Sequence, residues 1–188
     1  MLPLQAVLLG IELIARYDTL ERQIALAVTN VVGTGLLIFI GSRFIRAGSR
    51  LPAAVSWLAV AAIWFDAAGN FAHLYANIAW WDKLAHVVGT AAVAGAVWLS
   101  FKLFLENRRL SLPAFHHWLY AVSVAMLLAG LYEVSEYVGD WLFDTVRVTD
   151  LYDTADDLLW NFLAAAGAAW YFAARFQKPF PKLPTTDT

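Results

Sequence analysis

The sequence contains no cysteine, and only 15% of its 188 residues are charged. The absence of cysteine excludes disulfides and thiolate metal ligands. The scarcity of charge is unusual for a soluble domain, in which about a quarter of the residues are charged. Hydrophobic residues make up 61% of the chain, and the net charge of −2 provides no general attraction to nucleic acid. The composition therefore predicts an integral membrane protein whose partner is the lipid bilayer, with no nucleic-acid partner.

Long apolar segments recur along the chain, each close to the roughly 20 residues that a helix needs to cross a bilayer. We expect five membrane-spanning helices, at residues 24–41, 52–75, 84–105, 118–138 and 158–174. Residues 2–15 form a shorter apolar segment that contains Glu12, which indicates either a short tilted span or a helix in the membrane interface. No Lys or Arg precedes it and no small-residue cleavage motif follows it, so we do not expect a removed signal peptide.

These segments predict an all-α fold, a polytopic transmembrane helix bundle with five spans and a sixth short helix at the N-terminus. Because the connections between the spans are short, residues 1–178 are expected to form one transmembrane domain. Residues 179–188 are expected to form a short, disordered cytoplasmic tail.

Basic residues are distributed unevenly along this predicted bundle. Nine of the 13 Lys and Arg residues follow the first, third or fifth span and so fall on one side of the membrane: Arg43, Arg46, Arg50, Lys102, Arg108, Arg109, Arg175, Lys178 and Lys182. An excess of Lys and Arg is typical of the cytoplasmic side. We therefore expect a cytoplasmic C-terminus and an outward-facing loop at residues 139–154.

Acidic and amide side chains gather at the opposite ends of four predicted spans, at spacings of three and four residues that place them on one helix face. The stripes comprise Asp66, Asn70 and His73; Asp82 and His86; Glu133, Glu136, Tyr137 and Asp140; and Asp153, Asp156, Asp157 and Asn161. A charged side chain at mid-bilayer costs about 2.5–3.5 kcal/mol, so Glu133 and Asp66 should face the bundle interior or water. The stripes therefore predict one pocket that opens to the outer face.

Only Lys83 and Arg147 bring positive charge to this end of the predicted bundle, so the carboxylates need protons, water or a bound cation. Imidazole with carboxylates suits Zn²⁺, Mn²⁺ or Fe²⁺, and oxygen ligands alone suit Mg²⁺. The predicted metal ligands are His86, Glu133 and Asp157. The predicted surrounding residues are Asp66, Asn70, Asp82, Glu136, Tyr137, Asp153 and Asn161. Two simpler explanations stay open, because acids are favourable in the first turn of a helix and clustered carboxylates can also relay protons.

Three short motifs within residues 80–168 resemble those of a known family. They are Trp-Asp-x-x-x-His at 81–86, Glu-x-x-Glu at 133–136, and Asp-x-x-x-Asp at 153–157 with Gly-Ala at 167–168. In these motifs the chain resembles the bacterial YjdF-type inner-membrane proteins, a family of unknown function. The chain departs from that pattern at Thr149, where the family carries Gly before Asp. Asp82, His86 and Asn161 also give a more distant resemblance to VanZ-like proteins, which are linked to glycopeptide resistance. The resemblance implies a multi-pass protein of the bacterial inner membrane but no established reaction.

Three functions remain open on the sequence. In the first, the pocket binds a divalent cation and acts on an amphiphilic envelope component such as a lipid head group, although no nucleophile is evident and enzymatic activity stays open. In the second, the protein is a small proton-coupled transporter, and Asp66, Glu133 and Asp157 relay the protons. The inner halves of the spans are almost purely apolar, which argues against this function because no polar path continues inward. In the third, the polar cluster only holds together the helices of a structural or assembly protein.

Overall fold

The computed structural model describes residues 2–14, 20–176 and 178–180, and within these ranges all regular structure is helical apart from a single bridge residue. The helices are α1 Leu2–Ile14, α2 Leu20–Arg46, α3 Ala53–Phe71, α4 Leu74–Asn77, α5 Trp81–Arg108, α6 Ala114–Phe143 and α7 Asp153–Arg175. The predicted all-α fold is thereby confirmed.

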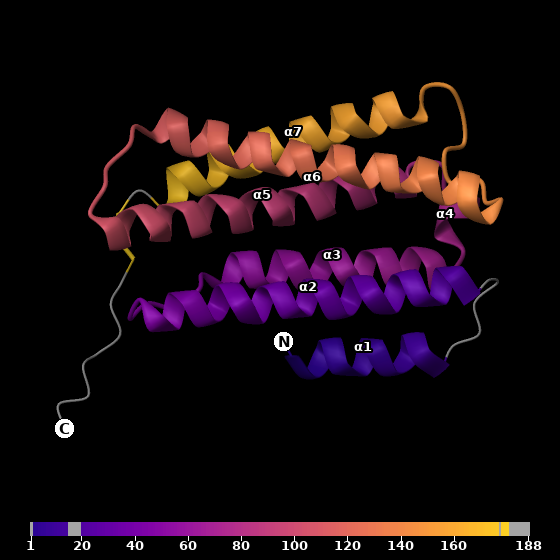
Figure 1. Ribbon diagram of the computed structural model, residues 1–188, viewed down its shortest axis with the longest axis horizontal. Coiled ribbons are helices and arrows are strands. Elements are labelled where there is room, and N and C mark those ends of the chain that lie inside the picture. The colour runs from indigo at the N-terminus through magenta and orange to yellow at the C-terminus, as the bar shows by residue number, and fades with distance from the viewer. Residues whose placement is uncertain (1, 15–19, 177, 181–188) are drawn as a thin grey trace.

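The long helices lie side by side along the long axis of the molecule, in two layers (Figure 1). α5, α6 and α7 pack against one another in one layer, and α1, α2 and α3 form the other. α5 joins the layers through its contacts with α3. The α2–α3 and α5–α6 connections lie at one end, and the α6–α7 connection and α4 lie at the other (Figure 1).

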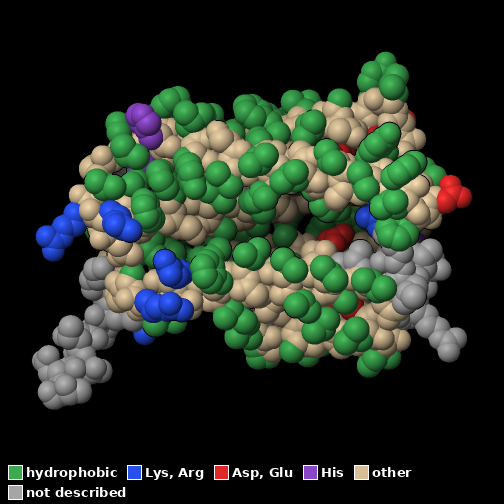
Figure 2. Space-filling view, viewed as in Figure 1, with side chains coloured by type: hydrophobic (Ala, Val, Ile, Leu, Met, Phe, Trp, Pro, Cys, Tyr) green, Lys and Arg blue, Asp and Glu red, His purple; other side chains and the backbone are tan. Residues whose placement is uncertain are grey.

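The two ends differ in charge. Lys and Arg side chains gather at the end that holds the α2–α3 and α5–α6 connections, whereas acidic side chains are visible toward the opposite end (Figure 2). We call the first the basic end, defined by Arg43, Arg46, Arg50, Arg108 and Arg109, and the second the acidic end, defined by the polar residues at the start of α5 and α7 and the end of α6.

Four helices in the described part of the chain are long and apolar enough to cross a membrane: Leu26–Arg46 within α2, Ala53–Phe71, Trp81–Arg108 and Ala114–Phe143. α7 has 23 residues, a length of about 35 Å. Its first turns contain Asp153, Asp156 and Asp157, and Asn161 follows, so its composition is less apolar than that of the four. The presence of several membrane-spanning helices is confirmed, whereas the predicted number of five is not.

The second predicted span is too long at its C-terminal end. α3 ends at Phe71, and His73 adopts a left-handed backbone with φ of 54°, which an α-helix does not contain. The short helix α4 follows. The prediction that His73 shares a helix face with Asp66 and Asn70 is therefore wrong, although the two helical residues of that stripe do share a face.

Both α3 and α6 begin directly after a proline. Pro52 and Pro113 occupy the N-cap positions with φ of −56° and −55°, values that lead into a helix. Proline also has no N–H to satisfy at a helix start, which explains why these helices begin where they do.

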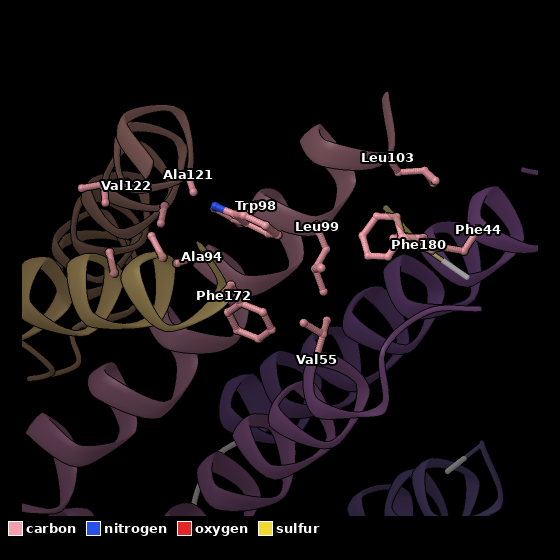
Figure 3. Packing of buried hydrophobic residues seen from close by; sticks show 13 residues of the cluster. Phe44, Val55, Ala94, Trp98, Leu99, Leu103, Ala121, Val122, Phe172 and Phe180 are labelled. Atoms are coloured by element: carbon pink, nitrogen blue, oxygen red, sulfur yellow. The ribbon is translucent and has the colours of Figure 1, made fainter. Parts of the chain in front are cut away.

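Buried apolar side chains from α2, α3, α5, α6 and α7 pack into one core (Figure 3). Phe172 of α7 is fully buried and points toward Trp98 of α5, with 6.5 Å between the ring centroids. Alanines on the facing helices surround these rings: Ala94, Ala121, Ala125, Ala165 and Ala169. Small residues of this kind let helix backbones approach closely in a membrane.

The bundle extends past the predicted boundary at residue 178. Phe180 is buried, its ring meets that of Phe44 edge-on at 5.0 Å, and its N–H donates to Glu106 Oε2 at 3.3 Å. The start of the predicted tail is therefore packed in the core. Residues 181–188 lie outside the described residues, and their disorder stays a prediction.

α1 lies lengthwise against α2 and α3 (Figure 1). Its buried face carries Gln5 and Glu12, which bind neighbouring helices: Asn30 Nδ2 donates to Glu12 Oε2 at 3.1 Å, and Trp64 Nε1 donates to Gln5 Oε1 at 2.9 Å. With 13 residues, α1 is about 20 Å long, less than the roughly 30 Å of a bilayer core.

Gly95 should tolerate no side chain. A Cβ at this position would lie 2.5 Å from Cε2 of the buried Phe172 ring, whereas a Cβ at Gly167 would meet nothing within 4 Å. We expect Gly95→Ala to lower the melting temperature by the equivalent of about 1–3 kcal/mol, as overpacking does, and Gly167→Ala to leave it unchanged or raise it. Thermal unfolding of both variants in detergent checks this, and equal melting temperatures would contradict the close packing of α5 on α7.

Candidate metal centre

His86 of α5 lies among carboxylates from three helices at the acidic end. Its Nε2 is 3.7 Å from Asp82 Oδ1, one turn earlier on α5, and 3.7 Å from Asp157 Oδ2 of α7. Its Nδ1 is 3.7 Å from Glu133 Oε1 of α6. The structure thus brings together the three predicted ligands, and it adds Asp82 at the same distance.

The cluster is buried on its inner side and accessible on its outer side. Glu133 and Asp157 are only 4% and 2% exposed, and the buried atoms Glu133 Oε1 and Asp157 Oδ1 have no hydrogen-bond partner among the described residues. Leaving such oxygens unsatisfied is costly. The side chain of Asp82, by contrast, is 40% exposed. A cation could therefore enter past Asp82 and satisfy the inner carboxylates.

Two groups of ligand atoms lie within 4.8 Å of one another, and they share His86. One consists of Asp82, His86 and Asp157, and the other of His86, Glu133 and Glu136. Zinc–nitrogen and zinc–oxygen bonds of 2.0–2.2 Å put tetrahedral ligand atoms about 3.4 Å apart, so the 3.7 Å separations at His86 need only a small contraction.

The predicted ligands Glu133 and Asp157 lie at opposite nitrogens of the imidazole ring. A single ion bound to one ring nitrogen therefore cannot contact both Glu133 and Asp157 in the observed arrangement. Asp82 and Asp157 share Nε2, Glu133 lies at Nδ1, and the two groups are alternative sites around one histidine.

A chain of hydrogen bonds holds the imidazole ring. Asn161 Nδ2 lies 3.2 Å from His86 Nδ1, and Thr90 Oγ1 donates to Asn161 Oδ1 at 2.6 Å. Asn161 is 1% exposed, so this amide has little freedom to turn away. Because an amide nitrogen only donates, Nδ1 accepts in this arrangement, and the ring proton lies on Nε2, which faces Asp82 and Asp157. Thr90 was missed by the sequence analysis, although its spacing of four residues from His86 is the signal that places both on one helix face.

The two cations expected at this end do not neutralise the buried carboxylates directly. Lys83 Nζ donates to Asp156 Oδ2 at 2.7 Å, and both side chains are substantially exposed. The Arg147 backbone N–H donates to both carboxylate oxygens of Asp140 at 2.8 Å. Neither contact supplies a hydrogen-bond donor to Asp157 Oδ1.

Asp66 and Asn70 form a neighbouring cluster of their own. Asn70 Nδ2 and Tyr75 Oη both donate to Asp66 Oδ1, at 3.0 and 2.9 Å. Burial raises the pKa of the Tyr75 phenol, so this group stays protonated as a donor. Asp66 thus has partners within the protein and belongs to neither of the two metal-binding groups.

Two predicted pocket residues supply no ligand atom to these groups. Tyr137 is 68% exposed and faces outward, because the narrow buried stripe of α6 that contains Glu133 does not extend to it. Asp153 Oδ2 accepts from the Thr149 N–H at 2.7 Å and so stabilises the loop before α7. Asp140 stabilises the same loop by accepting from Thr145 Oγ1.

The whole helical region of the chain matches one protein family. The family described as "Predicted membrane protein (DUF2238)" matches residues 1–178. The resemblance to YjdF-type proteins is consistent with this family, whereas the VanZ-like resemblance is not confirmed. No curated protein and no solved structure matches the chain.

Proposed function

The chain belongs to the DUF2238 family of predicted membrane proteins, and on that premise we propose that it binds a divalent transition-metal ion at its acidic end. The ligands are His86 Nε2, Asp82 and Asp157. The observation that supports this proposal most directly is that these three ligand atoms lie within 4.8 Å of one another. In addition, Asp157 Oδ1 is buried and has no hydrogen-bond partner among the residues that the structure describes. One nitrogen and two carboxylate ligands suit Zn²⁺, Mn²⁺ or Fe²⁺ better than Mg²⁺.

The surrounding residues have distinct parts in this proposal. Asn161, held by Thr90, orients the imidazole. For Nε2 to ligate a metal, the Asn161 amide must turn over, so that its oxygen accepts from Nδ1–H and its nitrogen donates to Thr90 Oγ1. Glu133 lies at the other ring nitrogen, and Glu136 belongs to the same group, so both carboxylates can accept a proton next to the site. A divalent ion at such a site can polarise a phosphoryl oxygen or activate water. We propose that the substrate or ligand is a phosphate-bearing lipid head group or another amphiphilic envelope component.

This proposal includes a topology. α7 is the fifth span, the acidic end faces outward, and the basic end with the C-terminus is cytoplasmic, in the bacterial inner membrane. The support is the gathering of Lys and Arg at the basic end (Figure 2). The lengthwise packing of α7 on α5 and α6 supports the fifth span.

The absence of native cysteine makes this topology testable by single-cysteine labelling. We expect Thr149→Cys, in the loop before α7, to react with an impermeant maleimide on intact cells. We expect Lys178→Cys, after α7, to react only once the cells are permeabilised. The reverse pattern would show that the basic end faces outward.

A proton-coupled transporter is less well supported. The apolar cluster that includes Ala94, Trp98, Leu99 and Phe172 fills the bundle between His86 and the basic end. A proton path through the described bundle would have to cross this cluster, which contains no titratable residue.

Titration calorimetry on the chelator-treated full chain in detergent tests the metal proposal. We expect Zn²⁺ or Mn²⁺ to bind at one site, with much weaker binding of Mg²⁺. His86→Ala should remove this binding, whereas His116→Ala, which changes a histidine of α6 near the basic end, should leave it intact. Equal heats of metal binding in the two variants would contradict the proposal.

A further inference from the structure

A cavity of about 320 Å³ lies between α2 and α5 at the basic end, far from the carboxylate cluster. Its apolar wall includes Phe39, Ile40 and Leu103. Its polar lining consists of Arg43, Ser100, Asn107 and Arg108. A second cavity of about 240 Å³ shares Arg43 and Asn107 and adds Arg46. The two form one groove that is apolar along one part and cationic along the other.

The guanidinium groups of this groove are positioned by aromatic rings of its own wall. Arg43 Cζ lies 5.8 Å from the centroid of the Phe39 ring, and Arg108 Cζ lies 5.7 Å from that of Phe104. Such cation–π contacts orient a guanidinium while leaving its N–H donors available. Both arginines are exposed, so their donors can reach a ligand in the groove.

The one carboxylate among the described residues of this end is already engaged. Glu106 pairs with Lys102 on the buried side of α5 and accepts the Phe180 N–H. It therefore does not neutralise the arginines of the groove, which present uncompensated positive charge at its mouth.

The groove lies where two membrane-spanning helices end. The apolar stretches of α2 and α5 finish at Arg46 and Arg108, so these side chains lie at the level of the lipid head groups. Phe39 and Ile40 lie one to two turns deeper, at the level of the acyl chains. A free phosphate ion would use only the cationic part, whereas a phospholipid would use both parts.

We propose that this groove binds an anionic phospholipid of the adjacent leaflet, with its phosphate on Arg43, Arg108 and Asn107 and an acyl chain along Phe39 and Ile40. Basic pockets between membrane-spanning helices are suited to anionic head groups. The site is independent of the metal centre and does not depend on which face of the membrane the basic end occupies.

Lipid selectivity can be measured by electron paramagnetic resonance. The full chain is reconstituted into dioleoyl-phosphatidylcholine vesicles that contain trace spin-labelled phosphatidylglycerol or spin-labelled phosphatidylcholine. We expect phosphatidylglycerol to associate with the protein roughly 25-fold more strongly, since each of the two guanidinium groups contributes about a factor of five. Arg43→Gln/Arg108→Gln should reduce the preference to near unity.

Two further variants distinguish a built site from general charge attraction. Arg50→Gln/Arg175→Gln removes the same charge from exposed residues that do not line the groove, and it should keep the preference. Ser100→Phe fills the cavity without changing its charge, and it should lower the preference. Equal association of the two lipids, or an equal loss in the Arg50/Arg175 variant, would overturn the proposal. Displacement of the labelled lipid by inorganic phosphate would show a phosphate site instead and would also overturn the proposal.

Discussion

Asp157→Asn is expected to abolish the rise in melting temperature that Zn²⁺ or Mn²⁺ gives to the wild-type protein. At a free metal concentration 100 times the dissociation constant, binding stabilises the folded state by about 2.7 kcal/mol. For a chain of this length, that corresponds to roughly 5–11 °C. Without metal, the variant should melt at the wild-type temperature or higher. The substitution removes a charge that is 2% exposed and lies near other carboxylates, which relieves both desolvation and repulsion.

Asp156→Asn is the matched control, because it makes the same chemical change at the neighbouring position. Asp156 pairs with Lys83 near the surface and belongs to neither metal-binding group. The variant should keep the metal-dependent shift and lose little stability, as exposed ion pairs contribute about 0–1 kcal/mol. Suppose instead that metals leave wild type unchanged and Asp157→Asn melts lower than wild type. The cluster would then stabilise the packing of α7 on α5 and would not bind a metal ion.

Lys102→Met is expected to destabilise the protein strongly at the basic end. Lys102 is 7% exposed, its Nζ pairs with Glu106, and it lies 5.0 Å from the centroid of the Phe180 ring. Breaking a fully buried ion pair costs about 3–5 kcal/mol. The Glu106 side chain is 24% exposed, so we expect a loss at the lower end of this range. The same loss should release Phe180, whose N–H donates to Glu106.

The double variant Lys102→Met/Glu106→Leu should recover much of this loss, because no uncompensated charge remains. Arg175→Gln, an exposed residue near the same end, is the control and should change stability little. Unfolding in a denaturing detergent series measures all three. If Lys102→Met behaves like the Arg175 control, the ion pair does not hold the C-terminal segment to α5.

The hydrophobic pattern was sufficient to predict the helices, because lipid requires long apolar segments and every backbone polar group in it must be satisfied within a helix. It did not predict the break after α3. The left-handed residue there is His73, and neither glycine nor proline marks the position. It also misplaced Phe180, since a proline-rich segment with few apolar residues gives no signal that one aromatic ring is buried.

The residues of the polar cluster could be predicted, but not their grouping. Spacings of three and four residues placed Asp82 with His86 on α5 and Asp157 with Asn161 on α7. Which carboxylate meets which ring nitrogen depends on how α6 and α7 are rotated against α5. A one-residue helical step turns a side chain by 100°, so the same periodicity is compatible with Tyr137 inside or outside the cluster. The structure places it outside.

The central claim is that the His86 cluster holds a divalent cation, and metal content tests it most directly. The full-length protein and Asp157→Asn would be purified in detergent, incubated with Zn²⁺ or Mn²⁺, desalted and measured by elemental analysis. We expect close to one metal ion per chain in wild type and almost none in Asp157→Asn. Equal metal content in the two proteins, or no metal in wild type, would contradict the claim.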